Sequence, residues 1–415
     1  MNHLIKNKRS TRRPWLALPV VAAFWLSATP ANADVVTDWN VKANEILTAS
    51  GMGTPPAIRT MAIVQTATYE ALNAITKRYP AGTYKLAAAP GASADAAVAA
   101  ANRAVLTKLV PAQQAAIDAA YQASVAKLAE GAGKAAGIDV GEKAAAAVLG
   151  SRADDGAATK ETYRPHSAPG SYVPTAIPAT PHWGARRPWL MKSASQFRPA
   201  APPALTSDVW TRDFNEIKSV GDKASTKRTA EQTAIAQFWE TTLPAIYHGV
   251  VRSVAAAPRR EVTQNARLFA AATQAADDAL IAVFDAKYHY SFWRPVTAIR
   301  NADNDGNNAT ERAVSWTPLS DTPMHPEYPC AHCILASSIG TVLQAEIGKG
   351  PTPQLSTTSS SAKGAQRTWK TVDAFVQEVS NARIYGGMHY RNSTVVGVAM
   401  GKQIGALAAA MFPSK

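Results

Sequence analysis

Cysteine is nearly absent from this chain of 415 residues, which contains only Cys330 and Cys333. Two cysteines cannot build a framework of disulfides, so the fold must be held mainly by packing. Runs of lysine and arginine are also absent beyond residue 13, which argues against a nucleic-acid partner, because such proteins usually cluster their basic residues. The formal net charge of +13 fits a small anionic ligand better, and a plain basic surface is the alternative.

Other common signals are missing as well. The sequence has no G-x-S-x-G, no P-loop and no H-E-x-x-H motif, no internal repeat, and little of the alternation that is typical of strands. Beyond the N-terminal leader, no segment reads as apolar enough to cross a bilayer. We therefore expect a soluble mature protein without stable membrane insertion; its oligomeric state is not encoded in any motif that we recognise.

The N-terminus has the order of a secretory signal peptide. Residues 1–13 carry five basic residues and no acid, residues 14–28 are apolar, and residues 31–33 are the small-x-small cleavage signal Ala-Asn-Ala. The apolar run is too short for a membrane span, which needs ~20 residues. Residues 11–16 are also compatible with a twin-arginine signal. Removing residues 1–33 lowers the formal charge to +8, and we predict export to the periplasm or the medium.

Helical periodicity dominates the rest of the chain and predicts an all-α protein built from helix bundles. The helices are predicted near residues 56–78, 92–108, 111–129, 135–150, 207–221, 228–242, 262–293, 332–348, 364–384 and 393–412. Residues 160–205 are rich in proline and fit no regular element, and their tryptophans favour a long ordered loop. We predict that this loop is the last part of an N-terminal helical region, 34–205, and that a second helical region, 206–415, follows it.

Two segments of the second region place cations and histidines near predicted helix ends. Lys287 and Arg294 are seven residues apart, so a helix that ends before Pro295 would place both on one face. His332 stands where a proline-rich stretch gives way to an apolar helix, and the free N–H groups of a helix N-terminus bind anions. Surface cations and a capping histidine are the ordinary alternatives for each segment taken alone.

A third segment contains Arg383 and His389 on either side of Gly386-Gly387. The glycines should end one helix before another begins, so the two side chains can converge on one point. The ordinary alternative is a glycine turn with a nearby histidine.

Together the three segments resemble the signature of vanadium-dependent haloperoxidases and type-2 phosphatidic acid phosphatases. That signature is Lys, six residues, Arg-Pro; then Pro-Ser-Gly-His; then Arg, five residues, His, three residues, Asp. The matching residues are Lys287, Arg294, Pro295, Pro329, His332, Arg383 and His389. The neighbouring Phe292-Trp293, Tyr328-Pro329, the proline-rich loop and residues 61–75 look more like haloperoxidases than lipid phosphatases.

The resemblance implies a catalytic helical region at 206–415 with an oxyanion site. Its residues would be Lys287, Arg294, Cys330, Ala331 and Arg383 for the oxyanion, His389 for the bond to vanadium, His332 for proton transfer, and Trp293 and Ser393 in support. The cofactor would be vanadate, and phosphate could occupy the same site. His325 precedes His332 by seven residues, where chloride enzymes often carry Phe and bromide enzymes often carry His, which favours bromide or iodide.

The implied activity is halide oxidation with hydrogen peroxide, followed by transfer to an organic acceptor. One alternative is an acid phosphatase on the same scaffold, which hydrolyses a phosphate ester through a phosphohistidine. Another is a non-catalytic oxyanion-binding protein, because Cys330-Ala331 replaces the usual Ser-Gly and Ser393 replaces the final Asp. A thiol is a weaker hydrogen-bond donor than a hydroxyl, Ala adopts positive φ less readily than Gly, and serine would orient His389 without a charge.

Cys330 and Cys333 also form a C-x-x-C at a predicted helix start. One hypothesis is a reversible disulfide that alters oxyanion binding, and the alternative is two packed, reduced thiols. A dedicated thiol oxidoreductase would place this motif in a βαβ context, which is missing. Residues 301–306 resemble the start of a calcium loop, but the twelfth position is Arg312, so we interpret them as a turn.

Overall fold

The computed structural model describes Met1 and residues 34–414, so the predicted signal peptide lies almost wholly outside the described residues. The helices are α1 (Val35–Ala49), α2 (Thr54–Thr76), α3 (Ala94–Leu109), α4 (Gln114–Val125), α5 (Ala132–Ser151), α6 (Asp208–Val220), α7 (Ala230–Phe238), α8 (Pro244–Ala255), α9 (Val262–Tyr290), α10 (Pro295–Arg300), α11 (Ala331–Ile347), α12 (Val372–Tyr385) and α13 (Arg391–Met411), with short 3-10 turns at Pro111–Gln113, Pro181–Ala185 and Ala302–Asn304. The prediction of an all-α fold is confirmed.

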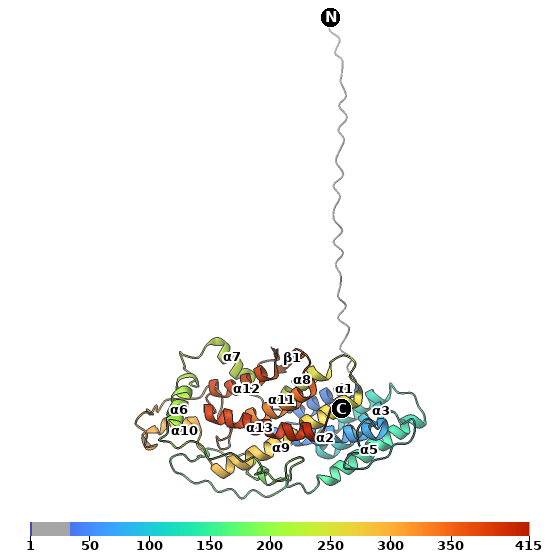
Figure 1. The fold of residues 1–415 in the computed structure, drawn as a ribbon, viewed down its shortest axis with the longest axis horizontal. Coiled ribbons are helices and arrows are strands. Elements are labelled where there is room, and N and C mark those ends of the chain that lie inside the picture. The colour runs from blue at the N-terminus through green and yellow to red at the C-terminus, as the bar shows by residue number, and fades with distance from the viewer. Residues whose placement is uncertain (2–33, 415) are drawn as a thin grey trace. The chain divides into compact units, whose positions relative to one another are not determined.

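Helix α9 is the centre of the fold. Of its 29 residues, 23 are buried, as expected for a helix that is apolar on nearly every side. It packs on α2, which belongs to a bundle with α3 and α5, and on its other side it packs on α11 and α13 (Figure 1). One hydrophobic core therefore includes side chains from both predicted regions, and the boundary at residue 205 stays a prediction.

The proline-rich stretch is an ordered loop that lies against the middle of α9. Asp278 of α9 accepts hydrogen bonds from the backbone N–H groups of Trp189, Leu190 and Met191 at 2.7–2.9 Å. Asp277 accepts from the indole of Trp189 and from Arg186. These polar contacts replace the backbone ladders that proline prevents the loop from forming.

Several helix boundaries differ from the predictions for physical reasons. Helices α1, α8 and α10 were not predicted. The predicted helix at 364–384 begins only at Val372, because residues Ala365–Trp369 form strand β2. This strand pairs antiparallel with β1 (Leu355–Ser359), with Leu355 opposite Trp369. Both strands are rich in Thr, Ser or aromatic residues that suit a pleated edge better than a helix.

The end of α9 also corrects the predicted geometry of the first cationic segment. The helix ends at Tyr290, because Ser291 adopts a left-handed conformation with φ 47°. Pro295 then starts α10, where its missing N–H costs no helical hydrogen bond. Lys287 and Arg294 are therefore not two positions on one helical face, since Arg294 is the N-cap of the next helix.

Helix α13 is long and apolar enough to cross a membrane, contrary to the expectation that no such segment follows the leader. Length and composition alone are weak evidence, because the core helix of a soluble protein passes the same test. One face of α13 lies on α11 at close range: a Cβ added at Gly401 would come within 1.9 Å of the Ser337 hydroxyl oxygen. This close packing brings the first turns of α11 and α13 together.

Candidate functional site

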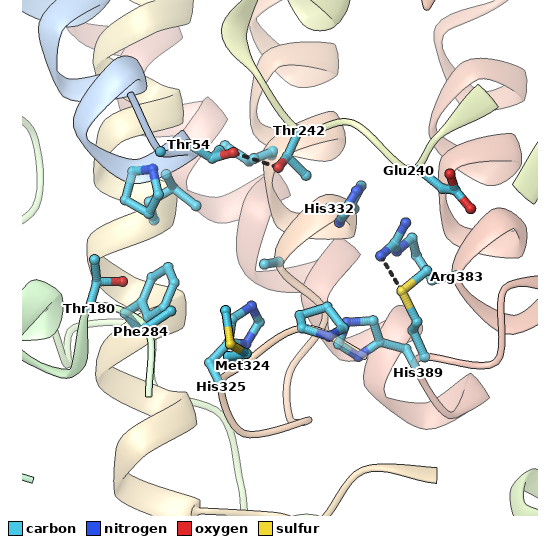
Figure 2. A pocket seen from close by; sticks show the side chains of 18 of the residues that line it. Thr54, Thr180, Glu240, Thr242, Phe284, Met324, His325, His332, Arg383 and His389 are labelled. Atoms are coloured by element: carbon cyan, nitrogen blue, oxygen red, sulfur yellow. Dashed lines mark hydrogen bonds between the residues drawn. The ribbon is translucent and has the colours of Figure 1, made fainter. Parts of the chain in front are cut away.

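A cavity of about 660 Å³ opens where α2, α9, α11 and α12 meet the loop at 319–325. His325, His332, Arg383 and His389 surround one space in it, as Figure 2 shows. Residues of the second and third sequence segments thus line one cavity. Lys287 and Arg294 of the first segment do not line it, and Arg294 contacts the rings of His325 and His389. The opposite wall is formed by hydroxyl and apolar side chains, which include Thr54, Thr180, Thr242 and Phe284.

Three buried cations stand at this end of the cavity: Lys287, Arg294 and Arg383 are each at most 1% exposed. Their donors go to neutral oxygens, imidazole nitrogens or sulfur. Lys287 Nζ donates to the carbonyls of Pro326 and Glu327, both at 2.8 Å. Arg294 donates to the carbonyls of His325 and Met388.

The third cation, Arg383, donates to the carbonyl of Trp239 and to the Met388 sulfur. None of the three forms an ion pair within 4.0 Å with a carboxylate among residues 34–414.

The burial of these three cations lowers their pKa values. Burial, together with the positive charge of Arg294, lowers the pKa of Lys287 well below its ordinary value. Burial also lowers the pKa of Arg294 to about 10 and that of Arg383 to about 9. Buried cations without a carboxylate partner are unfavourable by themselves.

His332 occupies the first turn of α11 and points into the cavity. Its Nε2 atom is buried and makes no hydrogen bond with any described residue. Burial and the nearby Arg383 hold the pKa of His332 well below its ordinary value, so the imidazole is neutral near pH 7. An adjacent bound anion would favour its protonated form. The residue is thus placed to take up or release a proton at the cavity surface.

His389 stands just before α13, in the turn after α12. Gly387 has φ 78°, and a Cβ there would lie 2.6 Å from the carbonyl oxygen of Gly221, so the predicted glycine break between two helices is confirmed. The His389 Nδ1 atom lies 2.8 Å from Oε1 of Glu327, and its Nε2 atom lies 3.4 Å from NH1 of Arg294. Burial raises the pKa of Glu327 to about 7, although Lys287 and Arg294 oppose that rise.

The comparisons with known proteins agree with this arrangement. Residues 267–414, which contain all three segments, match the second helical-bundle domain of vanadium chloroperoxidases. Vanadium chloroperoxidase from Curvularia inaequalis is 27% identical over 170 residues, which is 34% of this chain and only 28% of that relative. The C-terminal part of the chain is thus similar to the second helical-bundle domain of vanadium chloroperoxidases.

Solved structures show the same fold over nearly the whole chain. The crystal structure of a bacterial vanadium-dependent iodoperoxidase has a TM-score of 0.77 at 23% identity, and covers 91% of this chain and 95% of its own. The apo form of a bacterial vanadium-dependent chloroperoxidase has a TM-score of 0.69 at 18% identity, and covers 86% and 92%. At these identities the likeness establishes the fold alone.

Within this haloperoxidase fold, Cys330 is not the oxyanion donor that the sequence suggested. Its sulfur forms a disulfide with Cys333, so the interpretation of two reduced thiols does not hold in this structure. Its backbone N–H donates to the carbonyl of Ser393. Neither donor of Cys330 is therefore free. Ala331 does line the cavity at the start of α11, where helical N–H groups have no partner within the helix.

Two supporting residues also differ from expectation. The serine at 393 is not the hydrogen-bond partner of the His389 ring, because Glu327 occupies that place. Trp293 does not line the cavity; it is buried behind Arg294 and stacks on Trp210 with ring centroids 5.9 Å apart. It therefore contributes packing next to the site.

His325, the residue predicted to tune halide preference, does line the cavity. Its Nδ1 lies 3.0 Å from NH2 of Arg294, and its ring packs edge-on against Phe284. Since arginine can only donate, this contact uses the lone pair of Nδ1. Burial and the charges of Lys287 and Arg294 hold the pKa of His325 well below its ordinary value.

Sequence reasoning missed two acids of the site. Glu327 lies within the second segment, at 325–333, and an acid between two prolines next to a proposed anion loop was the available signal. Glu240 lines the cavity near Arg383 and accepts a hydrogen bond from Ser320 at 2.7 Å. Nothing in the sequence around Glu240 marks it, because its position depends on how α7 packs on α12.

Proposed function

We propose that this protein is a vanadate-dependent haloperoxidase that oxidises bromide or iodide with hydrogen peroxide. The observation that carries the proposal is the cluster of Lys287, Arg294 and Arg383, three buried cations without a carboxylate partner beside the ring of His389, whose Nε2 lies 3.4 Å from NH1 of Arg294. The similarity to vanadium chloroperoxidases makes vanadate the expected anion, and phosphate has the same charge-bearing oxygens.

The residues present fit such an anion. Polar atoms of cavity-lining residues that are buried without a hydrogen-bond partner among the described residues include Nε2 of His332 and Nε of Arg383. Both can serve an oxygen-rich ligand, and hydrogen bonds between ionised partners are the strong ones. We assign the oxyanion to Lys287, Arg294, Arg383 and the N–H of Ala331, with His389 as the ligand to vanadium.

When bound, vanadate would supply the activation of peroxide for two-electron oxidation of halide. The chain's own contribution is electrostatic and acid–base. The fixed cations hold negative charge without having to reorganise, and His332, neutral near pH 7, can accept a proton from a peroxide in the cavity and return it to a leaving oxygen. His325 would shape the halide's approach from beside Arg294.

The far wall of the cavity supports an organic acceptor as the final substrate. A volume of about 660 Å³ lies within the range of small-molecule pockets, ~300–1,000 Å³. Phe284, Leu280 and Met324 give this wall apolar surface, while Thr54 and Thr242 bond to each other at 2.7 Å. We also propose export to the periplasm or medium, which N-terminal sequencing of the mature protein would test.

The decisive experiment measures two activities of the purified mature protein, with and without added vanadate. We expect vanadate-dependent bromination of a phenolic dye, or oxidation of iodide, and little chlorination. His389→Ala should abolish both the activity and vanadate binding by calorimetry, whereas the exposed His289→Ala should change neither. Phosphate release from a chromogenic ester without halide oxidation would instead identify a phosphatase, and oxyanion binding without either activity a binding protein.

A further inference from the structure

A carboxylate that the family signature does not contain holds the histidine of the site. Oε1 of Glu327 lies 2.8 Å from Nδ1 of His389 and accepts from the backbone N–H of Tyr390 at 3.1 Å. The side chains of Glu327 and His389 are 0% and 1% exposed, so water does not compete for these hydrogen bonds. The ring orientation is therefore set by this one carboxylate.

The neighbours also decide which ring nitrogen carries the proton. A guanidinium can only donate hydrogen bonds, and NH1 of Arg294 lies 3.4 Å from Nε2 of His389. A proton on Nε2 would face another N–H there. In the neutral ring the single proton is therefore on Nδ1, where Glu327 accepts it, and Nε2 presents its lone pair on the side of Arg294.

We propose that Glu327 is a positioning residue that fixes His389 as the Nδ1–H tautomer and aims Nε2 at the bound oxyanion. This inference rests on the proposed function. It explains how the chain dispenses with an acid at position 393: the carboxylate comes from the loop before α11 rather than from α13. A histidine ligand usually donates its other N–H to such an acceptor, and loss of the acceptor typically weakens the site 10–100-fold.

Glu327 also links the histidine to the cation cluster. Its backbone carbonyl accepts from Lys287 Nζ at 2.8 Å while its side chain holds His389. One residue thus fixes the distance between a cation and the histidine that serve the same ligand. A change at 327 should affect anion affinity even if the cavity keeps its size.

The test compares Glu327→Met, which removes the acceptor, with Glu327→Gln, which keeps an oxygen acceptor of the same shape. The control is Glu216→Gln, because Glu216 binds Arg391, two residues after His389, without touching the ring. One readout is the dissociation constant of inorganic phosphate by calorimetry. The other is the ring ¹⁵N shift of His389, assigned with His389→Ala, which reports the tautomer without any ligand.

We expect Glu327→Met to weaken phosphate binding about tenfold or more and to lose the pure Nδ1–H tautomer. Glu327→Gln should retain that tautomer and bind within about threefold of wild type, and Glu216→Gln should match wild type. An unchanged affinity or tautomer in Glu327→Met, or a Gln variant that behaves like Met, would overturn the proposal. So would an Nε2–H tautomer in the wild type, whether or not the variants fold.

The two proposals fail separately. If the wild type binds neither phosphate nor vanadate, the proposed function is wrong, and the ring shifts still decide whether Glu327 sets the tautomer. If the wild type binds the anion and Glu327→Met binds it equally, only the positioning role is wrong.

Discussion

Two buried clusters of charge lie along α9, and they differ in how their cations are balanced. In the middle of the helix, Arg186 of the proline-rich loop pairs with Asp155 and Asp277 at 2.7 Å, and all three side chains are 0% exposed or nearly so. At its C-terminal end, Lys287 lies with Arg294 and Arg383, and no carboxylate pairs with any of them in the described chain.

The direction of the pKa shift separates the two clusters. Burial alone would lower the pKa of Arg186, but Asp277 and Asp155 outweigh it and raise the pKa above its ordinary value. In the site, burial lowers the pKa of Arg383 to about 9, although Tyr247 and Glu240 oppose this shift, and no carboxylate pairs directly with Arg383 in the described chain. A balanced cluster of this kind stabilises the fold, whereas an unbalanced one lowers stability until an anion binds.

The largest effect should come from breaking the balanced cluster. Arg186→Met leaves Asp277 and Asp155 buried with one cation fewer, and removal of one partner of a buried pair typically costs ~3–5 kcal/mol. We expect the free energy of unfolding in denaturant to fall by about that amount.

A matched control for this variant is Arg198→Met, which removes an ion pair between the same loop and Asp285 of α9. That pair is partly exposed, with side-chain exposures of 31% and 15%, so the loss should be below ~1 kcal/mol. Equal losses of stability in the two variants would contradict the distinction between the buried ion-pair cluster and the partly exposed pair.

The same change, arginine to methionine, should not lower the free energy of unfolding when it is made in the site. Arg383→Met removes a buried cation that has no carboxylate partner, so we expect the free energy of unfolding to stay unchanged or to rise. Phosphate affinity should fall ~10–100-fold, since hydrogen bonds to charged groups contribute ~1.5–3 kcal/mol. Calorimetry measures the phosphate affinity, and thermal unfolding with and without phosphate measures the stability. The free energy of unfolding of the wild type should rise by ~2.7 kcal/mol when phosphate is present at a hundred times its dissociation constant. A similar rise in Arg383→Met at the same phosphate concentration would refute the assignment.

A lowered pKa by itself does not mark a site, and His248 shows why. Burial lowers the pKa of His248 to about 3, yet its Nδ1 faces only the amides of Asn40 and Asn44, at 3.0 and 3.1 Å, and it lies outside the cavity. What distinguishes His332 and His389 is their position at a cavity beside buried cations that have no carboxylate partner in the described chain.

The lowered pKa of His248 makes the stability of the fold depend on pH. The native ring stays neutral down to about pH 3, while the unfolded ring binds a proton below ~6.5. The unfolded state therefore binds more protons at acid pH, and stability falls as pH decreases below ~6.5, by ~2 kcal/mol at pH 5. His248→Asn lacks this contribution. We expect the stability difference between wild type and variant to shift by that amount between pH 7.5 and 5 in urea titrations; a constant difference would contradict it.

The sequence predicted local features well and contacts between segments poorly. The spacing of the third segment predicted that Arg383 and His389 would converge, and both line the same cavity. It could not show that Glu327 would take the acid's role, since that depends on how the loop before α11 meets the start of α13. Arg294 was expected on the helix of Lys287 and instead caps α10, because Ser291 ends α9 early. Short strands such as β2 carry too few residues for their pattern to outweigh a following helix.

The smallest effect concerns the disulfide between Cys330 and Cys333, which stands beside the unbalanced cluster. It spans the N-cap and first turn of α11, the turn that also carries Ala331 and His332. Both cysteines are 0% exposed, and α13 packs over them, so a reductant can reach the disulfide only after local opening of the structure.

Reduction would free the Cys330 sulfur and loosen the turn whose N–H groups would face the oxyanion. We therefore expect the reduced protein to bind phosphate or vanadate with a dissociation constant changed by a few-fold, less than in Arg383→Met, while the Arg186 cluster and its contribution to stability stay as they are. Free thiols and affinity should be measured before and after reduction, with Cys330→Ser/Cys333→Ala as a variant that cannot reoxidise. Two free thiols in the protein as isolated, or an affinity that is the same in the oxidised, reduced and variant forms, would show that the disulfide does not control the site.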